Sequence, residues 1–487
     1  MKDLKEKTIR GGSVRVCSQA TVLILRVGSL ALLARLLDPT DFGLVGMVTA
    51  FTGVLNLFRD FGLSSAAIQR ATVSEEEHST LFWINLAVGA VLTLIALACA
   101  PAVGAFYREP RLFWVTAAIA PGFLFNAAGV QHSALLQRQM RFTALAMIDL
   151  VSLILSTVIG IVMAKAGFGY WALIAMTVSL PLIATVGLWL ATRWVPGRPR
   201  RHVDLRSMMR FGGTLTLNGL VLYIASNIEK VLLGRFWGAE AIGVYGRAFQ
   251  LIKIPTDNLN SAVGQVAFSA LSRVQDDPVR LRSYFLKGYS LVLALNIPIT
   301  MACAFFADDI IPLILGPKWL GAVALLRILS PTILVFTIAN PLGWLLDSLG
   351  LVARGLKIAL VFAPLMIIGI LVGLPYGPKG VAIGYSTVMI LWVLPVIAWA
   401  VHGTVISFKD VVMVVKQPLL SGLLAAVLAL GVRSLWGQSL TVFPRVVLEN
   451  AVLLGVYVAM LFYVMGQKSF YLNLFRKMGG TSLPTET

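Results

Sequence analysis

The chain alternates between apolar runs of about 20 residues and short polar segments rich in Pro, Gly and basic residues. The runs lack strict apolar–polar alternation, and their length is what an α-helix needs to cross a bilayer. They predict an all-α polytopic membrane protein with 14 transmembrane helices. The expected spans are 14–36, 41–63, 81–103, 112–136, 143–164, 169–192, 211–235, 242–270, 284–307, 321–348, 355–376, 379–400, 414–433 and 445–466. Between the ninth and tenth spans, the segment "IIPLILG" either lies at the interface or crosses the membrane.

Two short hinge sequences recur at a spacing of 200 residues, "RLLDPTDFGLVGM" (Arg35–Met47) and "RFWGAEAIGVYGR" (Arg235–Arg247). Taken singly, each is explained by Pro and Gly in a tight turn. Residues 10–46 and 210–246, aligned without gaps, share eight identities. These identities are Arg10, Gly12, Ile24, Leu32, Leu33, Arg35, Gly43 and Gly46 with their counterparts 200 residues later.

The repeat predicts how the chain is organised. Six spans separate the two copies, so both enter the membrane in the same sense, as in a parallel internal repeat. We expect two six-helix lobes, 1–192 and 211–402, joined by a basic cytoplasmic linker, 193–210. Residues 403–487 then form two extra helices and a cytoplasmic tail. Two bundles around a central cavity are the usual architecture for alternating access.

Composition and charge agree with a membrane protein. Of the 487 residues, 58% are hydrophobic and only 13% are charged, and the mean hydropathy is +0.85. The net charge of +18 comes from basic residues in short loops, which points to orientation in the membrane and not to nucleic-acid binding. The richest loop is 193–210, so both termini are expected in the cytoplasm. The first apolar run contains Arg15 and Arg26 and is read as a retained span, not a cleaved signal peptide.

Little in the sequence favours catalysis. The loops between spans are short, which disfavours a polymerase or ligase of glycan assembly, and no catalytic residue is expected. Three scattered cysteines without a CxxC pair give no disulfide framework, and four dispersed histidines give no metal site. No cofactor is therefore expected.

Ionisable residues inside the predicted spans are the candidate binding site, because a charge at membrane depth is costly and usually faces inward. Spans one and seven are equivalent in the repeat, and each carries a polar stripe on one helix face. The expected substrate-binding residues are Arg15, Gln19 and Arg26 in span one, Tyr223, Asn227 and Lys230 in span seven, and the further cations Arg247 and Arg327. Cations of this kind suit an anionic ligand.

The alternative is that these cations pair with carboxylates inside the protein. Candidate partners are Asp60, Asp149, Glu229, Asp347 and Glu449. Asp149 and Asp347 are also candidates for ion coupling, as is the membrane potential acting on the cations. Arg59 is read as an anchor of the second span. Asn126 and His132 are expected to bond helix to helix, and the alternative is that they hydrogen-bond sugar hydroxyls.

Three segments carry a family resemblance. "ARLLDPTDFGLVGMVTAFTGVLNLFRDFGLSSAAIQR" (Ala34–Arg70), "LGRFWGAEAIGVYGRAFQLIKIPTDNLNSAVGQVAFSALSRVQDD" (Leu233–Asp277) and "IIPLILGPKWLGAVALLRIL" (Ile310–Leu329) resemble signatures of bacterial polysaccharide transporters. The similarity runs from about residue 5 to about residue 475. It is strongest to the colanic-acid-exporter type of lipid-linked oligosaccharide flippase, in the multidrug/oligosaccharidyl-lipid/polysaccharide exporter superfamily.

The resemblance implies an inner-membrane flippase with two six-helix lobes. Its cargo would be an undecaprenyl-pyrophosphate-linked oligosaccharide repeat unit for exopolysaccharide or lipopolysaccharide, carried to the periplasmic leaflet. Membrane lipid, a glycan polymerase and a co-polymerase are the implied partners. By the same resemblance, the last two helices either shelter the polyprenyl tail or pack against a lobe. The alternatives are a cation-coupled multidrug exporter and a peptidoglycan-precursor flippase.

Overall fold

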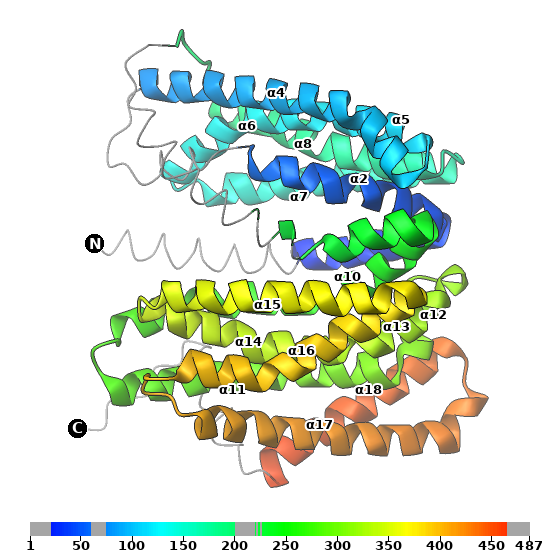
Figure 1. Ribbon diagram of the computed structural model, residues 1–487, viewed down its shortest axis with the longest axis vertical. Coiled ribbons are helices and arrows are strands. Elements are labelled where there is room, and N and C mark those ends of the chain that lie inside the picture. Colours follow the sequence, from blue (N-terminus) through cyan, green and yellow to red (C-terminus); the bar gives the residue numbers. More distant parts are fainter. Residues whose placement is uncertain (1–20, 60–74, 200–219, 221–222, 225, 465–487) are drawn as a thin grey trace. The chain divides into compact units, whose positions relative to one another are not determined.

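The computed structural model describes residues 21–59, 75–199, 220, 223–224 and 226–464 (Figure 1). Every regular element among these residues is helical and no strand occurs among them, which confirms the all-α prediction. Residues 21–36 form a helix at the start of this part of the chain. The labelled helices are α2 (Pro39–Leu57), α4 (Glu75–Tyr107), α5 (Arg111–Ile119), α6 (Pro121–Arg138), α7 (Phe142–Lys165), α8 (Tyr170–Thr192), α10 (Ile228–Arg273), α11 (Pro278–Phe305), α12 (Ala307–Ile314), α13 (Gly321–Leu329), α14 (Pro331–Ser348), α15 (Val352–Gly373), α16 (Gly377–Val401), α17 (Phe408–Trp436) and α18 (Val442–Ala459).

Ten helical stretches of the described residues are long and apolar enough to cross a membrane. They correspond to predicted spans two to six and nine to fourteen, because one stretch, Val352–Val401, contains both α15 and α16. The eighth predicted span is part of α10. The first and seventh fall partly outside the described residues, so the total of fourteen stays a prediction.

The uncertain segment between the ninth and tenth spans forms α12, which has 8 residues. At 1.5 Å per residue it is about 12 Å long, too short to cross a hydrocarbon layer of about 30 Å. Its side chains Ile311 and Leu315 are buried, so the segment packs against the protein. The tenth span begins only at Gly321.

The fourth and tenth spans are interrupted in the same way. α5 has 9 residues and α6 has 18, and the break lies before Pro121. α13 also has 9 residues and α14 has 18, and the break lies before Pro331. Proline has no N–H to donate and clashes with the preceding turn, which explains each break. The equal lengths recur six predicted spans apart, as the two hinge sequences do.

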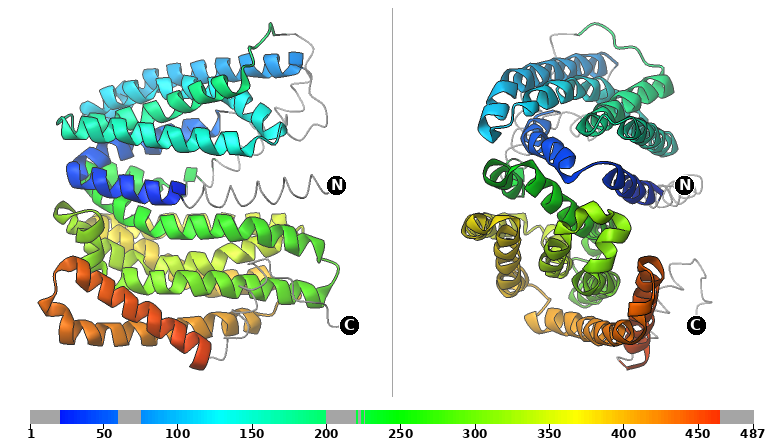
Figure 2. Two further views of the ribbon diagram at one scale, coloured as in Figure 1. Left: turned by 180° about the vertical axis from the view of Figure 1, so that it is seen from behind. Right: turned by 90° about the vertical axis from the view of Figure 1, so that its right-hand side faces the viewer.

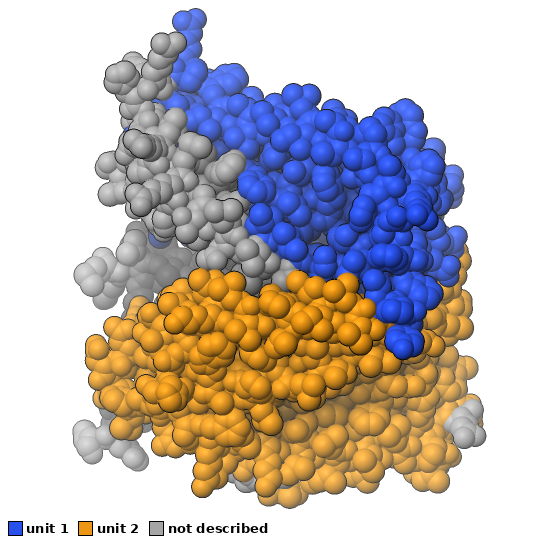
Figure 3. Space-filling view, viewed as in Figure 1, with its two compact units in different colours: residues 1–246, 374–378 blue, residues 247–373, 379–487 orange. Residues whose placement is uncertain are grey.

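The chain divides into two compact units (Figure 3). Unit 1 comprises residues 1–246 and 374–378, and unit 2 comprises residues 247–373 and 379–487. The division falls inside α10, a 46-residue helix that is kinked at Gly238, where φ is +80°. This kink lies in the second hinge sequence. A positive φ is readily adopted by glycine, so Gly238 makes the turn possible.

The first hinge is a helix start. Asp38 precedes α2, Pro39 is its first residue, and the Asp38 backbone N–H donates to Asp41 Oδ2 at 3.1 Å. Proline fits the first helical turn, and an acid in that turn satisfies an N–H group that would otherwise be unpaired. Each hinge therefore works locally as a turn.

Within each unit the long helices run side by side and roughly parallel (Figure 2). Close crossings use glycine. α15 and α16 pair through two glycine motifs spaced by four residues, in which Gly369 faces Gly384 and Gly373 faces Gly380. A Cβ on Gly384 would lie 2.0 Å from the carbonyl oxygen of Gly369. In a membrane, where lipid is as apolar as leucine, such close backbone packing holds helices together.

A hydrophobic core of unit 2 includes residues of the two C-terminal helices. Tyr289 on α11 is fully enclosed and donates to the carbonyl oxygen of Ile338 at 3.0 Å. Ala425 and Ala429 on α17 are completely buried in the same cluster as Leu453 on α18. α17 and α18 therefore pack as part of unit 2 through small residues.

Candidate functional site

The stripe predicted in span seven forms a hydrogen-bonded chain. Lys230 Nζ donates to Asn227 Oδ1 at 2.7 Å, and Asn227 Nδ2 donates to the Tyr223 carbonyl oxygen at 3.0 Å. The Tyr223 hydroxyl lies against the carbonyl oxygens of Thr49 and Ala50, at 3.2 and 3.3 Å. The structure therefore brings these three predicted residues together and attaches them to α2.

α2 has a glycine where the tyrosine approaches. A Cβ on Gly53 would lie 1.7 Å from the Tyr223 hydroxyl oxygen, so only glycine leaves room for the ring. Glu229, beside the stripe, is buried, with 1% of its surface exposed. The Lys230 ammonium is thus held by the Asn227 amide, and the preceding residue, Glu229, is a buried carboxylate.

The other predicted residues of span one are only partly described. Arg15 and Gln19 lie outside the described residues. Arg26 is exposed on the helix 21–36 and is close enough to Asp149 on α7 to interact with it electrostatically. Arg247 is half-buried at the start of the α10 part of unit 2, and Asp347 is exposed near the end of α14.

Unit 1 contains a pocket of about 290 Å³ between α6, α7 and α8, which we call the unit 1 pocket. It is lined by Arg59, Asn126, Gly129, Val130, Ser133, Ala134, Gln137, Asp149, Pro181, Ala184, Thr185 and Leu188. Arg59 Nη1 donates to Asn126 Oδ1 at 3.3 Å, while its Nε is buried without a hydrogen bond among the described residues. The sequence treats Arg59 as a membrane anchor, whereas the structure turns it toward a polar pocket.

Beside this pocket, α4, α6 and α8 enclose a histidine. His132 Nδ1 lies 2.7 Å from the Thr192 hydroxyl, and the His132 ring is 4.5 Å from that of Trp189. Phe82 and Trp194 complete the ring cluster. His132 is completely buried, which confirms its expected role in bonding helix to helix.

Unit 2 contains a network of charges where α12, α13, α17 and α18 meet. Arg327 Nη2 lies 2.5 Å from Asp308 Oδ2, so this predicted substrate residue has a carboxylate partner. Arg433 Nη2 lies 3.1 Å from Asp309 Oδ2, and its Nε lies 3.4 Å from Glu449. The sequence names Glu449 as a possible ion-pair partner, but not Asp308 or Asp309.

Arg445 joins the same network from α18. Its Nε donates to Asp309 Oδ1 at 2.9 Å, and its Nη2 contacts the same oxygen. Asp309 and Glu449 are 1% and 0% exposed. Burying a carboxylate is tolerated when an arginine compensates it, so the arginines hold these acids inside the protein.

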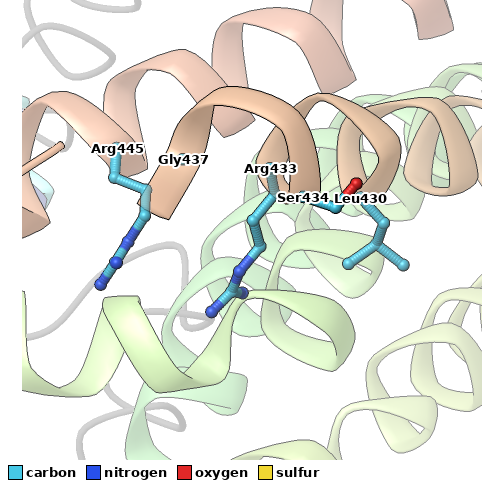
Figure 4. Close-up of a pocket in the computed structure, with 5 residues that line it drawn as sticks. All are labelled: Leu430, Arg433, Ser434, Gly437 and Arg445. Carbon is cyan, nitrogen blue, oxygen red and sulfur yellow. The ribbon is translucent and has the colours of Figure 1, made fainter. Parts of the chain in front are cut away.

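Two of these arginines line a pocket of about 400 Å³ at the turn between α17 and α18, together with Leu430, Ser434 and Gly437. Figure 4 shows Arg433 and Arg445 extending side by side from the two helices. The network has three arginines and three carboxylates, which balance in charge. It therefore fastens α17 and α18 to α12 and α13, and has no net charge while these ion pairs are formed.

The described residues contain no cluster of His, Cys, Asp or Glu that could hold a metal ion.

Comparison with known proteins identifies the family. The family model described as "Polysaccharide biosynthesis protein" matches residues 32–324. The chain is 29% identical to the lipopolysaccharide biosynthesis protein WzxC of Escherichia coli (strain K12), over 78% of each chain. It is 29% identical to the teichuronic acid biosynthesis protein TuaB of Bacillus subtilis (strain 168), over 72% of this chain and 73% of that one. It is 25% identical to the succinoglycan biosynthesis transport protein ExoT of Rhizobium meliloti (strain 1021), over 65% and 64%.

Solved structures show the same fold. The lipid II flippase MurJ, in an inward closed conformation, superposes with a TM-score of 0.73 at 14% identity, over 94% of this chain and 99% of that one. An inward-facing multidrug resistance MATE family transporter superposes with a TM-score of 0.63 at 14% identity, over 83% and 99%. The helical transporter fold is therefore shared. Since the family model covers more than half of its length, this multi-pass helical membrane chain belongs to the polysaccharide biosynthesis protein family.

Proposed function

We propose that this protein is a flippase of the bacterial inner membrane. It moves an undecaprenyl-pyrophosphate-linked oligosaccharide repeat unit from the cytoplasmic to the periplasmic leaflet, for exopolysaccharide or lipopolysaccharide biosynthesis. The observation that carries the proposal is family membership, together with relatives named for making lipopolysaccharide, teichuronic acid and succinoglycan. One of these relatives is named as a transport protein. A glycan polymerase and a co-polymerase are the proposed partners that use the delivered unit.

Alternating access needs two equivalent halves, and two structural features support them. The first is a reciprocal contact between the hinges. A Cβ on Gly43 would lie 1.7 Å from the Ala239 carbonyl oxygen, and a Cβ on Gly243 would lie 1.9 Å from the Pro39 carbonyl oxygen. Positions 243 and 239 are the counterparts of positions 43 and 39, 200 residues later. The two contacts are therefore the same contact with the roles of the two hinges exchanged. Such exchange is the mark of a two-fold axis.

The second feature is the matching interruption of the fourth and tenth spans, with 9 and 18 residues on either side of each break. Together these features support fourteen spans, with lobes 1–192 and 211–402 around the linker 193–210, and residues 403–487 appended. The hinge contact lies entirely within unit 1. Unit 1 therefore contains the first proposed lobe and also most of the hinge sequence that belongs to the second proposed lobe.

The proposed pyrophosphate contacts are the cations of spans one and seven. Pyrophosphate loses water on entering the membrane, and charged donors must replace that water. Lys230 is held in place by Asn227, and Arg26 lies on the helix 21–36. Arg15, Gln19, Arg247 and Arg327 belong to the same proposal. Arg327 would first have to leave Asp308. The basic linker supports cytoplasmic termini.

Asp149 and Asp347 are the proposed carboxylates for ion coupling. Asp149→Asn or Asp347→Asn should then change how transport depends on a sodium or proton gradient. An unchanged gradient dependence in both variants would exclude these two carboxylates as coupling groups, and transport that needs neither gradient would favour the membrane potential as the driving force.

The decisive experiment follows cargo in liposomes that contain the purified protein. Undecaprenyl pyrophosphate carrying a fluorescent oligosaccharide is the cargo, and a membrane-impermeant quencher reports its leaflet. Lys230→Gln should abolish movement, while Lys165→Gln, which removes an exposed lysine at the end of α7, should not. Movement of a small cationic dye without movement of this cargo would instead indicate a multidrug exporter. Preferential movement of a peptidoglycan precursor would indicate a peptidoglycan-precursor flippase.

A further inference from the structure

The unit 1 pocket offers both hydrogen-bond donors and acceptors. Arg59 supplies donors, and its buried Nε has no acceptor among the described residues. The Asp149 carboxylate supplies acceptors and forms no hydrogen bond or ion pair in the same part of the chain. A buried donor of this kind is normally satisfied, so a bound molecule is expected to supply its partner.

The remaining lining of the unit 1 pocket contains both polar and apolar side chains. Thr185 donates to the Phe125 carbonyl oxygen at 2.7 Å, and Asn126 accepts from Arg59, so these two side chains shape the walls. Pro181 and Leu188 provide apolar surface. Gln137 donates through Nε2 to Ser133 at 3.3 Å and keeps its carbonyl oxygen as a further acceptor.

We infer that the unit 1 pocket binds a sugar residue of the cargo, an inference that rests on the proposed flippase function. Sugar hydroxyls both donate and accept, so they match a carboxylate and a guanidinium in one pocket. Their C–H faces match the apolar surface of Pro181 and Leu188. The volume of about 290 Å³ lies at the small end of ligand pockets, about 300–1,000 Å³, and suits one sugar better than a whole repeat unit.

Charge excludes the other ligands of a flippase or exporter. Arg59 and Asp149 give the lining one cation and one carboxylate, so the pocket has no net charge to attract an anionic pyrophosphate or a cationic drug. A polyprenyl tail would leave both charged groups desolvated and unpaired. A neutral polyhydroxyl ligand satisfies both groups at once.

The depth of the pocket agrees with loading from one side. Asp149 is seven residues after the start of α7, and Thr185 is seven residues before the end of α8. At 1.5 Å per residue, each lies about 10 Å from its helix end. These helix ends are the ones that the charge pattern assigns to the cytoplasm, where the cargo is proposed to be assembled.

The test compares two lipids on the full-length purified protein in nanodiscs. The probes are undecaprenyl pyrophosphate alone and the same lipid carrying an oligosaccharide. Asp149→Asn and Arg59→Gln should each lower affinity for the sugar-bearing lipid about tenfold, about 1.4 kcal/mol, and leave affinity for the bare lipid unchanged. The control Asp276→Asn, in the loop after α10, makes the same chemical change on an exposed carboxylate and should alter neither affinity.

The outcomes separate this inference from the function on which it rests. Equal loss of affinity for both lipids in the two variants would overturn the sugar site and leave the flippase intact. The sugar site would also be overturned if Asp149→Asn changed the ion dependence of transport and left binding of the sugar-bearing lipid unchanged. A wild-type protein that neither binds nor moves the sugar-bearing lipid would overturn the proposed function as well.

Discussion

The reciprocal hinge contact allows a sharp test by adding one methyl group. In Gly243→Ala the new Cβ would lie 1.9 Å from the Pro39 carbonyl oxygen, and in Gly43→Ala it would lie 1.7 Å from the Ala239 carbonyl oxygen. Real Cβ atoms stay at least 3.0 Å from such neighbours. The two helices must therefore part by more than an ångström, because a backbone oxygen cannot rotate away as a side chain can.

The expected magnitude is the sum of two opposed effects. Replacing a helical glycine by alanine stabilises a helix by about 1 kcal/mol when nothing is in the way. Overpacking a tight contact costs about 1–3 kcal/mol. Gly246, three residues further along α10, has nothing within 4 Å of its Cβ position, so Gly246→Ala keeps only the favourable effect. The helix gain is common to both variants and cancels, so Gly243→Ala should be less stable than Gly246→Ala by about 1–3 kcal/mol.

The assay is thermal unfolding of the purified variants in one detergent, followed by tryptophan fluorescence. About 1 kcal/mol shifts the melting temperature by about 2–4 °C in domains of 150–250 residues, so the two variants should differ by several degrees. Gly43→Ala and Gly243→Ala should also be non-additive, because helices already parted by one methyl group accommodate the second at less cost. A Gly243→Ala protein that melts at or above Gly246→Ala would refute the contact.

Three further outcomes are expected. Tyr223→Phe removes the hydroxyl that bonds α2 and should lower the free energy of unfolding by about 0.5–1.5 kcal/mol; an unchanged melting temperature would contradict this. Asp309→Leu leaves Arg445 without its buried partner and should destabilise the protein by about 3 kcal/mol or more, measured by melting; a stability equal to wild type would show that the network is unimportant. In the loop between α4 and α5, the hydrogen bond from Arg111 holds the pKa of Glu109 below its usual 4.5. The pair therefore stabilises the fold above that pH, and the stabilisation is lost as the pH falls through the lowered pKa. The difference in melting temperature between wild type and Glu109→Gln should shrink from about pH 7 to about pH 3, and a constant difference would count against the ion pair.

Most of the local structure could be predicted because the bilayer imposes it. An apolar run of about 20 residues must satisfy its backbone internally, so helices such as α7 and α8 follow from composition alone. The turn at the second hinge follows from Gly238, and the start of α2 follows from the sequence Asp38-Pro39. The breaks before Pro121 and Pro331 needed only the chemistry of proline, yet hydropathy hides them because both halves of each span are apolar.

The partners of charged residues could not be predicted, because apolar spacing carries no information about which helix lies opposite. Arg59 bonds Asn126, 67 residues away, and so becomes part of a pocket instead of an anchor. Arg327 pairs with Asp308, which lies two residues before the segment "IIPLILG", whose position the sequence left open.

The sequence by itself determined the membrane class, most of the helices, the 200-residue spacing of the hinges and the stripe of Tyr223, Asn227 and Lys230. Helix periodicity and the desolvation of polar groups act locally, so they can be read along the chain. Only the tertiary structure decided that Gly43 and Gly243 exchange contacts, and that Asp309 is enclosed by Arg445. Those features depend on how closely two backbones approach and on which charges share one low-dielectric site, and packing alone sets both.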